Sequence, residues 1–145
     1  MVIRFYKLIF KNSFHLGLII KILAVFFLLP NIQYELFSPF INSFVTQPNF
    51  DPWSKFVTEG GSLISFPYGP VMLIFLYPLS LLENLIRIGF GDINFIFLSG
   101  IGIRISLLTF DYFLLLTLRK LLPEKEKEVD FFYWLSPVII YSTYW

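Results

Sequence analysis

The sequence predicts an all-α fold: polytopic transmembrane helices with a long outer loop that contains short interfacial helices. Of its 145 residues, 57% are hydrophobic, 21% are aromatic and only 14% are charged, whereas soluble domains carry about a quarter charged residues. The mean hydropathy is +0.73. A chain this short cannot enclose so many large side chains, because small domains leave much of their surface wet. We therefore expect a multi-pass integral membrane protein in contact with membrane lipid.

The same composition excludes several other classes of protein. A net charge of +1 does not supply the basic stripe that nucleic-acid binding needs, so we expect no nucleic-acid partner. The chain has no cysteine, which removes disulfides, thiolate metal sites and a cysteine nucleophile. Its single histidine, His15, lies beside the first apolar run, and the sequence contains no cluster with metal-ligand spacing.

The first span is expected at about residues 14–30. Residues 1–30 carry Arg4, Lys7, Lys11 and Lys21 and no acid, and basic residues close to a span accumulate on the cytoplasmic side. We therefore place the N-terminus in the cytoplasm. The segment resembles a signal peptide, but no small-residue cleavage site follows it, so we interpret it as an uncleaved span. For Lys21, snorkelling toward the cytoplasmic headgroups is favoured over buried pairing.

Residues 31–67 form the predicted outer loop, which alternates aromatic and aliphatic residues with proline, serine and glycine. Prolines at 39, 48, 52, 67 and 70 are expected to break any long helix. This pattern is typical of short helices that lie at the membrane interface. A loop with so much apolar content is more often functional than merely connecting.

Asp51 is the acidic residue of most interest in this loop. It lies in the run PNFDPWSKF. An aspartate followed by proline commonly starts a turn, and this reading explains the local sequence well. The alternative is a carboxylate held near the membrane surface as a general base or metal ligand, with Glu59 and Glu35 as partners from the same loop.

Two further membrane segments are expected, at about 68–88 and 93–118. The first is expected to start near Tyr68 and to be kinked by Pro78. A charged cytoplasmic connector follows at 119–130, and residues 131–145 begin a further span. Three consecutive crossings would put Arg119 and Lys120 outside, against the charge rule. Either the 68–88 segment is re-entrant, which is the favoured alternative, or the 93–118 block crosses twice near Gly100 and Gly102.

The 93–118 block also contains two charged residues, Arg104 and Asp111. They lie seven residues apart and therefore on one face of a helix, two turns from each other. An acid within the membrane indicates function by default. Pairing of Asp111 with Arg104 or Lys21, to hold helices together, is nevertheless the favoured role. We assign Lys21 and Asp111 as a structural intramembrane pair.

Four motifs in order carry a resemblance to a known family. They are a first span before a long outer loop with an acidic residue, then FPYGPVM at 66–72, RISLLTFDYFLL at 104–115, and WLSPVII at 134–140. Their order resembles the N-terminal part of the GT-C superfamily of polytopic glycosyltransferases, which use sugars linked to polyprenyl phosphate. The resemblance runs over most of the chain.

The resemblance implies transfer of a sugar from a polyprenyl-phosphate donor to a glycan or lipid acceptor on the outer side of the membrane. Asp51 would then be the catalytic residue, as a base or as the ligand of a divalent cation. Trp53, Glu59, Tyr68 and Arg104 would contact the substrates. The chain departs from the superfamily in having a single acid at this place, where many members carry a pair.

Members of the superfamily also have many more spans, and this sequence ends within an apolar segment at Trp145. We therefore expect an N-terminal fragment that is inactive alone. Two alternatives stay open: a small non-enzymatic membrane subunit or assembly factor, and a transporter fragment in which Lys21, Arg104 and Asp111 relay ions.

Overall fold

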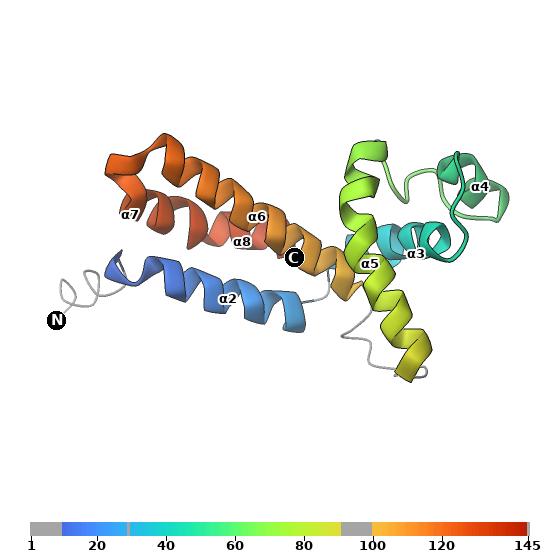
Figure 1. Cartoon of the computed structure of the whole chain (residues 1–145), viewed down its shortest axis with the longest axis horizontal. Coiled ribbons are helices and arrows are strands. Elements are labelled where there is room, and N and C mark those ends of the chain that lie inside the picture. Colours follow the sequence, from blue (N-terminus) through green and yellow to red (C-terminus); the bar gives the residue numbers. More distant parts are fainter. Residues whose placement is uncertain (1–9, 29, 91–99, 145) are drawn as a thin grey trace. The chain divides into compact units, whose positions relative to one another are not determined.

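The computed structural model describes residues 10–28, 30–90 and 100–144, and every regular element within these ranges is a helix. The all-α prediction is therefore confirmed for the described residues (Figure 1). The chain divides into two compact units. Unit 1 comprises Met1–Leu28 and Leu107–Trp145, and unit 2 comprises Leu29–Ser106.

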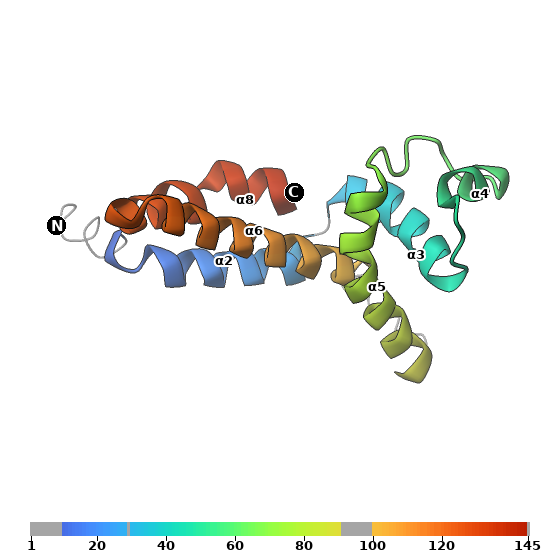
Figure 2. The same cartoon turned by 45° about the horizontal axis from the view of Figure 1, so that its top comes forward.

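Unit 1 is built around α2 (Ser13–Phe27) and the later turns of α6 (Ile101–Leu121). After α6 come a 3₁₀ turn η3 (Pro123–Lys125), α7 (Glu126–Val129), a π-helical turn η4 (Asp130–Trp134) and α8 (Pro137–Tyr144). Figures 1 and 2 show α2 running alongside these turns of α6. The core of the unit consists of Leu115, Val129 and Trp134, packed against Phe14, Leu18, Leu108, Leu118 and Tyr133.

Unit 2 contains a π-helical turn η1 (Gln33–Phe37), α3 (Ser38–Thr46), α4 (Pro52–Thr58), α5 (Pro70–Phe90) and the first turn of α6. Helix α3 packs on α5. Rings from the expected outer loop form one aromatic cluster, in which Phe40 stacks on Phe66 with centroids 4.9 Å apart. The indole N–H of Trp53 donates to the carbonyl of Phe66 at 3.1 Å. These contacts hold α4 and the loop after it against α3.

Pro39 does not interrupt the helix, contrary to the expectation from its sequence. The chain is helical without a break from residue 31 to 46, and the π-helical turn η1 lies directly before Pro39. A proline ring inside an α-helix clashes with the carbonyl four residues earlier. The wider π-helical turn relieves that clash, so the helix continues.

Two helices of the described part, α5 and α6, are long and apolar enough to cross a membrane, while α2 is a shorter apolar helix. Only 22% of the apolar window of α5 and 33% of that of α6 is buried. Val71 and Ile74 of α5 are 66% and 67% exposed. Lipid is the solvent that such outward-facing aliphatic side chains fit.

The expected segment boundaries differ from the helices in several places. The span expected at 14–30 corresponds to α2, and the segment expected at 68–88 corresponds to α5. Residues 93–99 of the expected 93–118 segment lie outside the described residues. From Ile101 the chain is one unbroken helix to Leu121. The alternative of two crossings near Gly100 and Gly102 also involves residues 93–99 and stays a prediction. Arg119 and Lys120 belong to this helix rather than to the connector.

Candidate functional site

Asp51 caps the N-terminus of α4. Its Oδ1 accepts the backbone N–H of Ser54 at 3.1 Å, and Pro52 occupies the first helical position. The backbone N–H of Asp51 donates to Asn49 Oδ1 at 3.2 Å. The sequence rule for Asp-Pro turns therefore accounts for its local geometry. The carboxylate is exposed to solvent.

The hydrogen bonds from Ser54, followed by a weaker one from Trp53, lower the pKa of the Asp51 carboxyl. Because the folded pKa is lowered, the cap stabilises the helix above the unfolded pKa of about 3.9 and is lost as the pH falls through the folded value. Asp51 is therefore ionised at neutral pH. A lowered pKa suits charge stabilisation better than strong general-base action.

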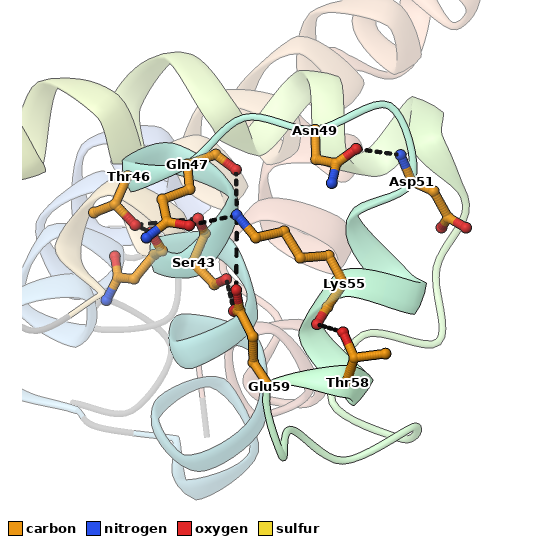
Figure 3. A network of polar contacts seen from close by, with 9 residues as sticks. Ser43, Thr46, Gln47, Asn49, Asp51, Lys55, Thr58 and Glu59 are labelled. Atoms are coloured by element: carbon orange, nitrogen blue, oxygen red, sulfur yellow. Dashed lines mark hydrogen bonds and ion pairs between the residues drawn. The ribbon is translucent and has the colours of Figure 1, made fainter.

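A polar network connects α3 and α4 beside Asp51 (Figure 3). Lys55 Nζ donates to Gln47 Oε1 at 2.6 Å and lies 3.7 Å from Glu59 Oε1. Ser43 Oγ donates to Glu59 Oε2 at 3.4 Å. Figure 3 shows the Asp51 carboxylate pointing away from this network, so the structure does not bring Glu59 to Asp51.

No group of three or more histidine, cysteine, aspartate or glutamate side chains gathers among the described residues in a way that could hold a metal ion. Asp51 alone supplies too few ligands for a divalent cation bound by protein groups only. The described residues around Asp51 therefore do not form a site that holds a divalent cation by protein groups alone.

The aromatic residues expected to contact substrate have packing roles in unit 2. Trp53 is half-buried against Phe40, with centroids 5.6 Å apart. Tyr68 packs edge-on against Phe37 and Phe66 at 5.4 and 5.6 Å and is 46% exposed. Tyr68 therefore presents part of its ring at the surface, whereas the indole N–H of Trp53 is already used.

Glu83 is an important residue that the sequence analysis missed. Its carboxylate comes from α5 and accepts the backbone N–H groups of Gly100 at 3.0 Å and Gly102 at 2.9 Å. These donors are at the start of α6, so Glu83 caps that helix and complements its dipole. A signal was present: Glu83 is the first charge after a long apolar run, and an acid in such a position needs a partner.

Arg104 lies one turn into α6 and is only 2% exposed. Its positive charge lies in the field of the Glu83 carboxylate. In this structure the guanidinium therefore faces the protein interior of unit 2. Direct contact between Arg104 and a substrate requires that this region open, and the substrate role of Arg104 remains a prediction.

Replacing Glu83 with alanine is expected to lower the free energy of unfolding by about 1.5–3 kcal/mol. The substitution removes the charged cap of α6, and it also removes the negative charge of Glu83 that stabilises the Arg104 guanidinium. Glu83→Gln should recover part of the loss, since its amide oxygen still accepts a hydrogen bond. Thermal unfolding in detergent micelles measures both. Glu35→Ala, an exposed acid of the same unit, is the control, and an equal effect there would refute the capping role.

Unit 1 contains a buried polar cluster inside its apolar helices. Lys21 Nζ of α2 forms an ion pair with Asp111 Oδ2 of α6. The hydroxyl of Tyr133 donates to Asp111 Oδ1 at 2.5 Å. The Lys21 ammonium also lies 4.6 Å from the centroid of the Trp134 ring, a cation–π contact. The side chain of Lys21 is 0% exposed, so the snorkelling interpretation is wrong.

Trp134 brings the segment after α6 back onto α2. Its indole N–H donates to the carbonyl of Phe14 at 3.0 Å, and its side chain is 0% exposed. Gly17 leaves the room it needs, because a Cβ there would lie 2.5 Å from Trp134 Cδ1. Asp130 adds a two-bond ion pair to Arg119, with both N–O distances 2.7 Å. Sequence reasoning missed Tyr133, Trp134 and Asp130.

Comparison of the chain with family models, with curated proteins and with solved structures finds no match. The case for a function therefore rests on the residues themselves. Of the candidate site residues, Asp51, Trp53, Glu59, Tyr68 and Arg104 all belong to unit 2, whereas Lys21 and Asp111 belong to unit 1.

Proposed function

We propose that the chain serves in a membrane glycosyltransferase that moves a sugar from a polyprenyl phosphate to a glycan or lipid acceptor. In this proposal α2, α5 and α6 cross the membrane, the N-terminus is cytoplasmic, and residues 31–67 lie on the outer side. The observation that supports it is Asp51: an exposed carboxylate, ionised at neutral pH and held at the start of α4. The aromatic cluster holds α4 and the loop after it against α3.

In the proposed reaction the oxygen of an acceptor hydroxyl attacks the anomeric carbon of the sugar. The bond from that carbon to the phosphate oxygen breaks, and the polyprenyl phosphate leaves with the electron pair. Asp51 accepts the hydroxyl proton as the new glycosidic bond forms. The lowered pKa makes Asp51 a weak base, but the hydroxyl becomes strongly acidic as its oxygen bonds to the anomeric carbon, so a weak base can take the proton. Tyr68 is a partly exposed aromatic residue of the same unit.

The cap and the proposed catalytic role of Asp51 are separable by substitution. Asparagine and serine both cap helices well, so Asp51→Asn and Asp51→Ser remove the charge and keep the start of α4. Under the proposal both reduce sugar transfer by at least about 100-fold, within the range that acid–base catalysis contributes. Transfer of tritiated hexose from its polyprenyl phosphate, in membranes containing the full-length protein, measures the rate.

The matched control is Asp51→Ala, which loses both the cap and the charge. If Asp51 acts only as a cap, Asp51→Asn and Asp51→Ser retain the transfer rate, and the alanine variant alone shows a lower yield of folded protein. That outcome removes Asp51 from the chemistry. Each transfer rate is divided by the amount of protein measured by immunoblot, so that differences in yield do not enter the comparison.

A transporter is the second candidate function, because a buried Lys21–Asp111 pair with a bound Tyr133 hydroxyl resembles the groups that relay protons between helices. Because loss of the Asp111 charge also destabilises unit 1, transport is compared in equal amounts of folded protein; under this alternative Asp111→Asn then abolishes transport and Asp51→Asn has no effect. A non-enzymatic subunit shows neither sugar transfer nor transport before any substitution. The two substitutions, assayed in parallel, therefore discriminate between the three functions.

A further inference from the structure

Three large apolar side chains of unit 2 point into solvent from the segments on either side of α4. Phe50 precedes the helix and is fully exposed, at 109%, while Leu63 and Ile64 follow it and are 81% and 67% exposed. Side chains of this size and exposure, on the two segments that flank one short helix, suit an apolar environment better than water. We call Phe50, Leu63 and Ile64 the apolar edge.

The apolar edge is held in place from both sides. After α4, the N–H of Gly61 donates to the carbonyl of Phe56 at 2.8 Å, and that of Ser65 to the carbonyl of Ser62 at 3.1 Å. Phe66, two residues beyond Ile64, is 2% exposed in the aromatic cluster. Before α4, Phe50 adjoins the Asp51 cap. These hydrogen bonds and the buried Phe66 set the course of the loop that carries Leu63 and Ile64.

The edge lies close to the start of a helix that can span a membrane. Ile64 precedes Pro70, the first residue of α5, by six positions, which bounds the separation at about 20 Å. Val71 and Ile74 in the first turns of α5 are outward-facing aliphatic side chains as well. When α5 crosses a bilayer, its first turn lies at the boundary between hydrocarbon and headgroups, and the short chain between Ile64 and Pro70 keeps Ile64 within reach of that boundary.

We propose that Phe50, Leu63 and Ile64 insert into the lipid interface beside α5 and so keep Asp51 at the depth of the lipid headgroups. The support for insertion is the exposure of the three side chains, the hydrogen-bonded loop that carries Leu63 and Ile64, and the position of this loop shortly before α5. The placement of Asp51 deepens the proposed function and rests on it, because the phosphate of a polyprenyl-phosphate donor lies at headgroup depth. The polar network of Ser43, Lys55 and Glu59 remains in water.

The absence of cysteine from the 145-residue chain allows a direct test with single cysteines at positions 50, 63 and 64 of this chain, each labelled with the fluorophore NBD. Ser54→Cys and Thr58→Cys, exposed polar positions of α4, are the matched controls. In phosphatidylcholine–phosphatidylglycerol vesicles the three edge labels should emit at shorter wavelength, resist iodide and be quenched by shallow doxyl lipids. The two controls should be quenched by iodide.

Edge labels as open to iodide as those at 54 and 58 would overturn the proposal. So would edge labels shielded from both iodide and doxyl lipids, since a protein partner or a second copy would then cover them. The link to function has its own readout: Phe50→Ser should lower kcat/KM for the lipid-linked donor about tenfold, with kcat contributing to the loss, because the base Asp51 is no longer held at the depth of the donor phosphate. Inserted labels with unchanged kcat and kcat/KM keep the lipid contact and remove the placement of Asp51.

Discussion

Asp111→Asn is expected to lower the free energy of unfolding of unit 1 by about 3–5 kcal/mol, because it leaves the buried ammonium of Lys21 without its counter-charge. Lys21 is 0% exposed and Asp111 7% exposed, so water cannot replace the lost partner. The cation–π contact with Trp134 remains, but a neutral amide and an indole ring do not balance a charge in an apolar core. Thermal unfolding in detergent micelles, followed by circular dichroism, measures the change.

The double variant Lys21→Met/Asp111→Leu is the matched control. It removes both charges and fills the site with apolar groups, which is often neutral for a buried pair. We expect it to unfold within about 1.5 kcal/mol of the wild type, with the remaining loss from the unpaired Tyr133 hydroxyl. A single variant as stable as wild type, or a double variant as unstable as the single one, would contradict the coupling of α2 to α6 through this pair.

The Lys21–Asp111 pair shows how far a sequence can predict tertiary contacts. Each charge is conspicuous in an apolar segment, and the cost of burying it unpaired predicts that it has a partner. The choice between Lys21 and Arg104 for Asp111 depends on which helices lie side by side, and that is a property of the whole fold. In the structure Arg104 lies near Glu83 instead. Tyr133 and Trp134 reach the pair only because η4 turns back onto α2 and α6.

In other parts of the chain, rules about neighbouring residues predicted the structure better than expectations about contacts between distant segments. The Asp-Pro dipeptide predicts the start of a helix or turn, and Asp51 is the cap of α4. Gly60 directly follows the C-terminal residues of α4 and has a φ of +92°, which residues with side chains rarely adopt. The prediction that Pro39 breaks the helix is wrong, because the composition gives no sign of the π-helical turn that precedes it. The partners of Glu83 are backbone N–H groups, which leave no trace in side-chain patterns.

Close approach of α5 and α6 depends on Gly102. A Cβ at this position would lie 2.5 Å from the carbonyl oxygen of Leu79 and 2.7 Å from the Cα of Ser80. These are backbone atoms, so no change of rotamer can relieve the clash, and the helices must separate. Separation also lengthens the bond from the N–H of Gly102 to Glu83. Gly102→Ala is therefore expected to destabilise unit 2 by at least about 1–3 kcal/mol, the range for an overpacked core.

Gly89→Ala is the matched control for Gly102→Ala, because Gly89 lies in α5 with nothing within 4 Å of its Cβ position. Alanine is the better helix former by about 1 kcal/mol, so this variant should be as stable as the wild type or more stable. Both are measured by thermal unfolding in micelles. Equal stability of the two variants would show that α5 and α6 do not touch at Gly102. A loss of stability in Gly102→Ala alone would instead establish that α5 and α6 touch at Gly102. The hydrogen bonds from Gly100 and Gly102 to the Glu83 carboxylate require this close approach of the two helices.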